Sequence, residues 1–402
     1  MRILVVPKDF PSKREPYAGI FILRRIQALR ELGHDISVFR IVPAAPPFGE
    51  KWNAYRSIPR DETIDGFPVR AVRAVIPPRM IGMEYVPWSL RGALEAEIKR
   101  TRAELVHASF LIPCGQLATR QRLVPSIVTS HGIDAHKWPK LRPGLWRASK
   151  EAVEKASRVT AVSAFIAERL SELSPRSVCV IWNGADERFF YPRDRAPARL
   201  ALDLPPDRKI LGFAGNILRV KGLFDLVDAL NRIPRERRPL LAIGGVGPDA
   251  KELERAAQHA GVEMRLLGRL DSNGVATLFA ASDVVTLPSY AEGLPNVVCE
   301  AMLSQRAVVA STAGGTPEIV THGRTGLLVT PGDPAELAAA LSRAFENDSL
   351  RDALALEARS FAVQNLTWRI SAKKYEELYR EVLEPSDRIP RADRSHIPSA
   401  AR

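Results

Sequence analysis

The fold is decided by residues 283–318, DVVTLPSYAEGLPNVVCEAMLSQRAVVASTAGGTPE. The short, β-branched run 284–287 predicts a buried strand. A loop with Glu292 follows, and Pro295 suits the first position of a helix. The helix that it would open is apolar on almost every side apart from Glu300. A strand, a glycine-containing loop and a mostly buried helix are therefore expected in this order.

Glu300 has two interpretations, because a buried carboxylate is costly unless it is hydrogen-bonded. In the first, it bonds a nearby backbone amide or an arginine and only holds the fold. In the second, it binds a ligand, since free N–H groups and the dipole at the helix start form an anion site that Glu292 and Glu300 flank. Carboxylates would repel a phosphate, so we expect them to accept hydrogen bonds from hydroxyls on either side of it. A ligand with hydroxyls on both sides of a diphosphate is a nucleotide sugar.

The run S-Y-A-E-G-L-P-N-V-V-C-E-A-M resembles the signature of the family 4 retaining glycosyltransferases, which have the GT-B fold. The resemblance extends from Arg2 to about Trp368 and is densest over 210–332. It implies that Glu292 contacts the donor sugar and that Glu300 binds the nucleotide ribose. It also implies that the loop and helix start between them stabilise the departing diphosphate; these residues are Gly293, Leu294, Pro295, Asn296 and Val297.

With 402 residues, the chain is long enough for two ordinary domains. We expect an α/β protein of the GT-B type, with two Rossmann-like βαβ domains at 1–195 and 205–367 and a cleft between them. The resemblance implies that a last helix, at about 368–383, crosses back onto the first domain. Residues 193–209 are rich in proline and charge and show little periodicity, which predicts a linker. The Pro-, Arg- and Ser-rich tail 384–402 predicts disorder.

Strands of the first domain are predicted at 2–7, 36–42, 104–109, 126–132, 158–163 and 177–184. The loop after the first strand ends at Gly19, which is either a turn residue or a point where a ligand phosphate approaches closely. His131 ends a later strand, where a histidine is more often structural than catalytic. The resemblance favours the phosphate interpretation for Gly19, and it places His131 next to the donor sugar.

In the second domain, Lys221 matches the lysine that pairs with the donor diphosphate in the family. A lysine at a helix start is disfavoured by the dipole, which makes an anionic partner more plausible. The family often carries an arginine where this chain has Asn216, and this departure weakens the case for a two-cation clamp. Arg219 is the available substitute. Gly268 belongs to the segment 264–270, whose backbone contacts the base in the family.

The charge is uneven: residues 1–200 hold 33 Lys and Arg against 20 Asp and Glu, a balance of +13 in a chain of net charge +12. A basic face suits nucleic acid, an anionic membrane or an acidic small substrate, or it reflects an arginine-rich proteome. No nucleic-acid recognition motif is present in the sequence, so we expect no such partner.

Three cysteines, Cys114, Cys179 and Cys299, lie far apart without metal-ligand spacing. This spacing favours a reducing compartment and predicts neither a disulfide framework nor a metal or other cofactor. No apolar run approaches the roughly 18–20 residues of a membrane span, so a cytoplasmic location is expected.

The sequence leaves two interpretations open for the role of each of two segments. Residues 137–150 interleave Trp138 and Trp146 with lysines and arginines, which suits peripheral contact with the anionic inner face of a membrane or, equally, a core or interdomain helix. Residues 43–100 form either connecting structure or the face that binds the acceptor.

The sequence therefore predicts a retaining hexosyltransferase, with His131, Lys221 and Glu292 as its catalytic residues. The donor is expected to be a nucleotide sugar, with UDP, GDP and ADP all open. The acceptor is expected to be a lipid-linked, glycolipid or polysaccharide acceptor in cell-surface glycan biosynthesis. The alternative is another nucleotide-sugar enzyme of the GT-B fold, such as an epimerase or a phosphorylase-like enzyme, because a fold alone does not fix a function.

Overall fold

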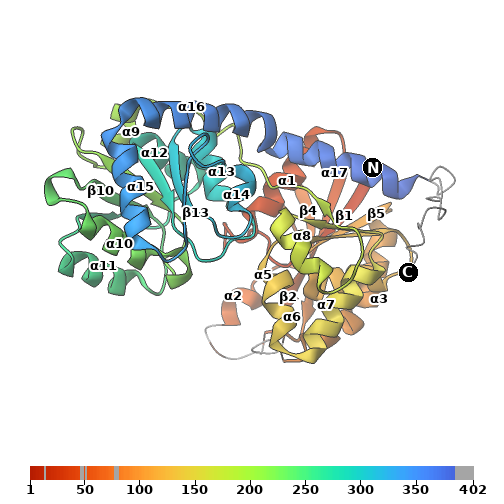
Figure 1. The fold of residues 1–402 in the computed structure, drawn as a ribbon. Coiled ribbons are helices and arrows are strands. Elements are labelled where there is room, and N and C mark those ends of the chain that lie inside the picture. Colours follow the sequence, from red (N-terminus) through yellow and green to blue (C-terminus); the bar gives the residue numbers. More distant parts are fainter. Residues whose placement is uncertain (13–14, 46–48, 50–51, 77–80, 385–402) are drawn as a thin grey trace, which may run out of the picture.

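The computed structural model describes residues 1–12, 15–45, 49, 52–76 and 81–384. Within them, the chain forms two sheets that lie next to each other, each covered by helices (Figure 1). None of the helices in these stretches combines the length and the apolar character that crossing a membrane requires.

The first sheet is eight-stranded, in the order β3-β4-β2-β1-β5-β6-β7-β8. Only β3 is antiparallel to its neighbour. The central strands β1, β5 and β6 are buried almost throughout, as expected for a parallel sheet with helices on both faces. Its strands are β1 (Arg2–Val6), β2 (Asp35–Pro43), β3 (Asp61–Ile64), β4 (Phe67–Ala74), β5 (Leu105–Ser109), β6 (Ser126–Ser130), β7 (Arg158–Ala161) and β8 (Cys179–Val180).

The helices of this part of the chain vary in length, and several are single turns. They are α1 (Ile20–Glu31), α2 (Asn53–Arg56), α3 (Val86–Thr101), α4 (Gln116–Arg120), α5 (Ile133–His136), α6 (Trp138–Leu141), α7 (Pro143–Lys155) and α8 (Ala164–Ser171).

The second sheet is six-stranded and parallel, in the order β11-β10-β9-β12-β13-β14. Its strands are β9 (Ile210–Ala214), β10 (Leu240–Gly244), β11 (Met264–Leu266), β12 (Val284–Leu287), β13 (Ala307–Ser311) and β14 (Leu327–Val329). Its helices are α10 (Leu223–Arg232), α11 (Ala250–His259), α12 (Ser272–Ala281), α13 (Asn296–Leu303), α14 (Thr316–Ile319), α15 (Pro334–Glu346) and α16 (Asp348–Asn365).

The predicted linker 193–209 is wrong in part, because it contains the helix α9 (Arg195–Ala201). Arg199 of this helix is buried and donates to the Asp283 carboxylate at 2.9 Å, just before β12. The ion pair between Arg199 and Asp283 therefore holds α9 against the second sheet. The helix was not predicted because an ion pair leaves no periodic apolar pattern in the sequence. The predicted tail 384–402 lies, beyond Glu384, outside the described residues.

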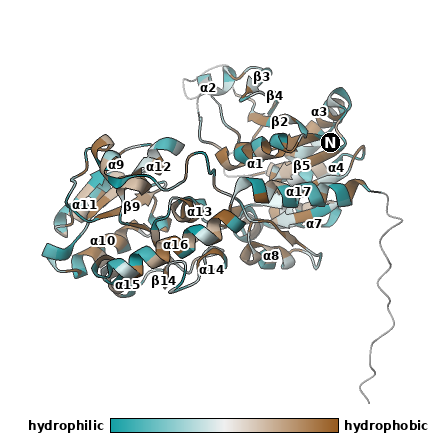
Figure 2. Ribbon diagram, turned by 90° about the horizontal axis from the view of Figure 1, so that it is seen from above, coloured by the Kyte–Doolittle hydropathy of each residue, from teal (hydrophilic) through white to brown (hydrophobic). Residues whose placement is uncertain are grey.

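The last helix, α17 (Trp368–Leu383), returns to the first sheet and packs against α1. Figures 1 and 2 show α16 and α17 following one another across both sheets. Tyr375 and Tyr379 are buried on the first sheet. The Tyr379 hydroxyl lies 2.6 Å from His107 Nδ1, and His107 Nε2 lies 2.7 Å from the Thr129 hydroxyl. Polar contacts inside an apolar interface therefore fix how α17 sits on the strands.

We expect Tyr379→Phe to destabilise the protein by about 1–2 kcal/mol, because a buried His107 nitrogen loses its hydrogen-bond partner. The measurement is urea unfolding of the full chain. Tyr85→Phe is the matched control, since Tyr85 is 68% exposed. Equal midpoints for the two variants would contradict the assignment of this bond to the interface.

Candidate active site

The loops at the carboxyl ends of the two sheets touch each other. Gly293, between β12 and α13, lies so close to the first sheet that a Cβ there would stand 2.3 Å from the His131 carbonyl oxygen. The Asn183 side chain donates to Asn296 at 3.2 Å. Because ligands of parallel α/β sheets bind beyond the carboxyl ends of the strands, the space around this contact is the candidate site.

The carboxylate of Glu318, on the second sheet's side, stabilises this contact by hydrogen bonds. Glu318 in α14 accepts hydrogen bonds from the backbone N–H groups of Ala164 and Phe165, at 2.8 and 2.9 Å, and from the indole N–H of Trp182 at 3.0 Å. These two amides open α8, so the positive end of that helix faces a negative charge. The sequence analysis missed this carboxylate.

A pocket of about 270 Å³ lies beside the contact, at the ends of β9 and β10. Glycines bring its backbone close together: a Cβ at Gly245 would stand 1.8 Å from the Gly215 carbonyl oxygen. Tyr17 and Ile20 reach it from the other sheet's side. The remaining lining comes from the second sheet's side and includes Asn216, Arg269, Asp271, Val297 and Glu300.

Glu300 lines this pocket. Among the described residues its carboxylate makes no hydrogen bond and no ion pair, which removes the interpretation of Glu300 as a merely structural group bonded to an amide or an arginine. Burial raises the pKa of Glu300 to about 8; Arg24 on α1 opposes this rise and Asp186 adds to it. Arg24 itself lies 3.4 Å from the Asp186 carboxylate.

Lys221 and Glu292 are brought together. Lys221 ends the short helix η5 (Arg219–Lys221), and its Nζ donates to Glu292 Oε1 at 2.7 Å. The side chains are 24% and 11% exposed, so the pair is partly shielded from water. Each of the two predicted catalytic groups thus neutralises the other until a ligand offers other partners.

Arg219 lies elsewhere. Its side chain is 62% exposed, pairs with Glu252 and covers the ring of Phe224. It therefore does not accompany Lys221 in a two-cation clamp in this structure. Gly268 follows β11 with φ of 69°, directly before the pocket residue Arg269.

The other predicted donor-binding residues surround the interface. Leu294 and Pro295 are buried, and Asn296 begins α13. Gly19 has φ of 63°, and a Cβ there would stand 2.1 Å from the Asp9 carbonyl oxygen, which supports its interpretation as a turn residue. Its neighbours Tyr17 and Ile20 line the pocket.

The ring of His131 lies between Phe21 and Phe110, with ring centroids 4.8 and 4.9 Å away. Both ring nitrogens are buried without a hydrogen-bond partner in the described part of the chain. Burial, with the charge of Arg25 in second place, holds the pKa of His131 well below its usual value. His131 is therefore a neutral imidazole at physiological pH.

Asp134 holds the His131 loop in place, and the sequence analysis missed it. Its buried carboxylate accepts from the backbone N–H groups of His131, Gly132 and Leu111 and from the Ser130 hydroxyl, at 2.9–3.1 Å. The sequence contains a signal for this role. Asp134 follows His131 by three residues and lies at the start of a short helix, where an aspartate commonly accepts hydrogen bonds from backbone N–H groups. The His136 ring donates from Nδ1 to the Gly132 carbonyl oxygen at 2.8 Å.

The tryptophans of segment 137–150 face the interior. Trp138 is 8% exposed and stacks on Phe110, and Trp146 packs against the core. The interpretation as a core helix therefore holds for both rings, and neither is available as a membrane anchor. No group of three or more His, Cys, Asp or Glu side chains within the described ranges is placed to hold a metal ion.

Comparison with known proteins agrees with this geometry. Residues 18–189 match the family model described as Glycosyltransferase Family 4, and residues 208–347 match Glycosyl transferases group 1. A D-inositol 3-phosphate glycosyltransferase of Nocardioides sp. is 30% identical over 80% of this chain and 78% of its own length. The chain belongs to the family 4 glycosyltransferases, also called group 1.

Another relative of this family 4 glycosyltransferase is the putative teichuronic acid biosynthesis glycosyltransferase TuaC of Bacillus subtilis, 29% identical over 87% of this chain and 90% of its own. Among solved structures, sucrose-phosphate synthase from Thermosynechococcus elongatus superposes with a TM-score of 0.77 at 22% identity, over 95% of this chain and 98% of its own. Anabaena HepE, solved with UDP-glucose, gives 0.73 at 22% identity, over 95% and 100%. These likenesses confirm the predicted GT-B fold.

The raised pKa of Glu300 predicts how the stability of this glycosyltransferase depends on pH. The folded state holds the Glu300 proton up to about pH 8, whereas an unfolded glutamate releases it near its ordinary pKa, so rising pH between these values costs stability. Glu300→Gln removes that cost. We expect the stability gained by the variant to grow between pH 5.5 and 8.5, by on the order of 1–3 kcal/mol.

The measurement is urea unfolding at several pH values. Glu187→Gln is the control, because Glu187 is exposed. A gain for Glu300→Gln that does not change with pH would contradict the raised pKa.

Proposed function

We propose that this glycosyltransferase moves a hexose-type sugar from a nucleotide-sugar donor to a glycan, glycolipid or lipid-linked acceptor, in cell-surface glycan assembly in the cytoplasm, with retention of the anomeric configuration. The observation that carries the donor assignment is the unpaired carboxyl group of Glu300 in a glycine-lined pocket at the ends of β9 and β10. The Lys221–Glu292 pair joins the loops that follow β9 and β12.

The donor would lie across the contact between the sheets. The ribose hydroxyls would donate to Glu300, and the diphosphate would face the N-terminus of α13 and Lys221. Lys221 would then leave Glu292 for the phosphate, and Glu292 would accept hydrogen bonds from the sugar hydroxyls. The ion pair of the free protein thus keeps both groups ready for two different parts of one ligand.

Catalysis would be electrostatic. The bond between the anomeric carbon and the diphosphate oxygen breaks, its electron pair leaves with the nucleoside diphosphate, and Lys221 stabilises the charge that develops there. The acceptor hydroxyl forms the new bond to the same carbon, and its proton passes to the departing diphosphate. A neutral His131 next to the sugar would not oppose the positive charge on the anomeric carbon. The closed loops would exclude water, which limits hydrolysis of the donor.

Related proteins support both the proposed acceptor class and the proposed donor class. The TuaC relative is named for the biosynthesis of teichuronic acid, and HepE was solved with UDP-glucose. The choice among UDP, GDP and ADP stays open.

The first test is calorimetric titration of the protein with UDP, GDP and ADP. We expect one nucleotide to bind, and Glu300→Ala to weaken it by about tenfold, because a hydrogen bond between uncharged groups contributes about 0.5–1.5 kcal/mol. Glu187→Ala should leave binding unchanged. If none of the three nucleotides binds to the wild-type protein, the donor assignment is wrong.

The second test separates binding from chemistry. We expect Glu292→Ala to lower transfer by about 100-fold or more while nucleotide binding persists, because Glu292 would contact only the sugar. Lys221→Ala should weaken both. Undiminished transfer by Glu292→Ala would remove its proposed role, and isomerisation of the donor without an acceptor would favour the epimerase alternative.

A further inference from the structure

Arg25 on α1 is a buried cation without an anionic partner in the described part of the chain. Its residue is 1% exposed, and its Nη2 donates to the Ser109 hydroxyl at 2.9 Å. Its Nε is buried with no hydrogen-bond partner, and it forms no ion pair among the described residues. A fully buried arginine normally has an anionic partner, because removal of a charge from water is costly. Stability alone therefore does not explain a guanidinium at this position.

The guanidinium of Arg25 connects three elements of the first domain. Its Cζ lies 5.1 Å from the centre of the Tyr375 ring on α17, a distance at which a cation and an aromatic ring attract each other. Ser109, which accepts its hydrogen bond, is the last residue of β5. Arg25 therefore joins α1 to α17 and to the carboxyl end of β5.

The two rings that flank His131 are chain neighbours of this connection. Phe21 lies four residues before Arg25, one turn earlier on α1, and its ring centroid is 4.8 Å from that of His131. Phe110 directly follows Ser109, and its ring centroid is 4.9 Å from that of His131. The hydrogen bond between Arg25 and Ser109 therefore helps to set the space between the two phenylalanine rings.

The backbone of Phe110 has an unusual conformation. Its φ is 74°, in a region that residues other than glycine rarely adopt. Such a conformation persists where the surrounding structure imposes it. The backbone N–H of Phe110 donates to the Thr129 carbonyl oxygen at 2.8 Å, and its own carbonyl oxygen accepts from the Gly115 N–H at 2.9 Å. The hydrogen bond to Ser109, one residue earlier, is a further restraint on this turn.

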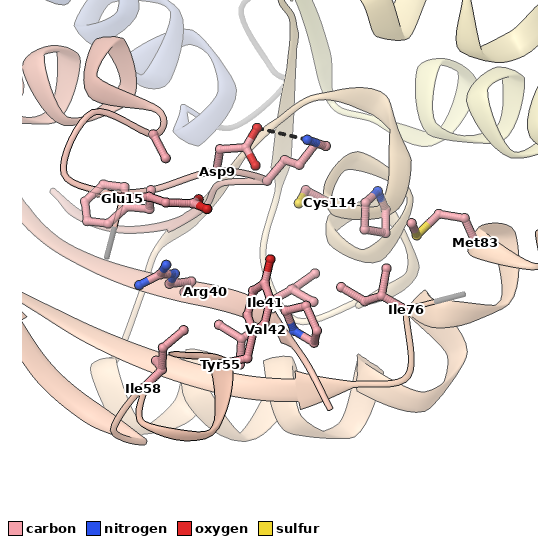
Figure 3. Close-up of a pocket in the computed structure, with 15 residues that line it drawn as sticks. Asp9, Glu15, Arg40, Ile41, Val42, Tyr55, Ile58, Ile76, Met83 and Cys114 are labelled. Atoms are coloured by element: carbon pink, nitrogen blue, oxygen red, sulfur yellow. Dashed lines mark hydrogen bonds and ion pairs between the residues drawn. The ribbon is translucent and has the colours of Figure 1, made fainter. Parts of the chain in front are cut away.

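Lys8 also lies next to Phe110, but its charge is engaged. Its Nζ is 5.6 Å from the centre of the Phe110 ring and donates to Asp9 at 2.9 Å, the contact drawn in Figure 3. Lys8 thus has an anionic partner, whereas Arg25 has none among the described residues.

Arg25 lines neither of the two pockets near the candidate site. One is the Glu300 pocket, and the other, of about 220 Å³, lies at the carboxyl ends of β1 and β2 (Figure 3). The stretch 43–100 supplies part of the second pocket's wall. The parts of this stretch outside the described residues are 46–48, 50–51 and 77–80. Any effect of Arg25 on a ligand must therefore pass through the residues that it holds in place.

We propose that Arg25 is a positioning residue of the transfer reaction. By holding α1 to the end of β5, Arg25 keeps the His131 ring between the two phenylalanines, with both ring nitrogens free for the donor sugar. This inference rests on the proposed function, in which His131 lies next to that sugar, and it adds a residue that acts from outside both pockets.

The charge of Arg25 supports the same role. Together with burial, which is the larger cause, it holds the pKa of His131 well below its usual value. A neutral imidazole has one nitrogen that donates and one that accepts, so it can bond a sugar hydroxyl in either direction. Other ionisable groups near this ring have partners of their own, namely His107, Asp134, Lys221 and Glu292.

The test is calorimetric titration of the full chain with UDP-glucose, GDP-mannose and ADP-glucose, each beside its own nucleoside diphosphate. We expect Arg25→Met to weaken binding of the nucleotide sugar by about threefold to tenfold, the size of one hydrogen bond between uncharged groups. Binding of the matching nucleoside diphosphate should not change, because the Glu300 pocket contains neither Arg25 nor His131.

Ser109→Ala removes the same hydrogen bond from its other end and keeps the charge. It should weaken the nucleotide sugar selectively as well, and it tests the inference if Arg25→Met does not fold. Tyr379→Phe is the matched control, because the hydrogen bond that it removes lies in the same buried interface but goes to His107. This control should lower the urea midpoint and leave the binding of both ligands unchanged.

NMR of the full chain labelled at histidine reports the position of the ring directly. The His131 resonances, assigned with His131→Asn, are displaced by the two aromatic rings that flank them. We expect Arg25→Met to move these resonances, while those of His259 and His322, on the second sheet's side, stay in place.

Three results would overturn the inference: unchanged His131 resonances in Arg25→Met, equal losses of nucleotide sugar and nucleoside diphosphate, or nucleotide-sugar binding that Arg25→Met and Ser109→Ala both leave intact. The last result would leave the proposed function standing, since the donor would still bind. Failure of the wild type to bind any of the six ligands would contradict the proposed function itself, and with it the role of His131 at a sugar.

Discussion

The hydrogen bonds that Glu318 accepts from the start of α8 and from Trp182 connect the two sheets at the candidate site. Both amides belong to the first sheet's side, and the carboxylate belongs to the second. With this contact made, the Gly293 loop presses against the His131 carbonyl, where no side chain would fit. The same contact brings Tyr17 and Ile20 over the Glu300 pocket. The site is therefore built by two halves that are incomplete when they are apart.

Within that closed contact, the polar groups fall into two kinds. Asp134 and Glu318 are saturated with hydrogen bonds, so they define the positions of loops and leave nothing for a ligand. Glu300 and the ring of His131 keep unused hydrogen-bonding capacity in the described structure. Since buried polar groups without partners are unfavourable, these two groups support the proposed substrate site.

The sequence was sufficient for most of the fold, because the buried parallel strands are short apolar runs that end in glycine loops. It placed β1 and β12 and the crossing helix α17 within a residue or two. Glu292 and Glu300 were predicted through the spacing of one motif, and Lys221 through its match to a lysine of the family. Glu318 was missed, since it acts through partners that only the folded chain brings near, 154 residues away for Ala164. The same reason hid α9, which a buried ion pair fixes. Asp134 was missed although three of its four partners lie within four residues of it in the sequence.

The excess positive charge of the first half shows that a count of charged residues does not reveal which of them are paired in the folded protein. A balance of +13 over the first 200 residues suggests a basic surface that attracts anions. In the folded protein, many of these cations are used internally: Arg25 is buried and donates to Ser109, Arg40 faces Glu62, and Arg120 pairs with Glu151. A guanidinium that is already paired contributes to the count but has little attraction left for a further anion. The charge that a substrate meets is therefore set by the groups at its own site and not by the count for half of the chain.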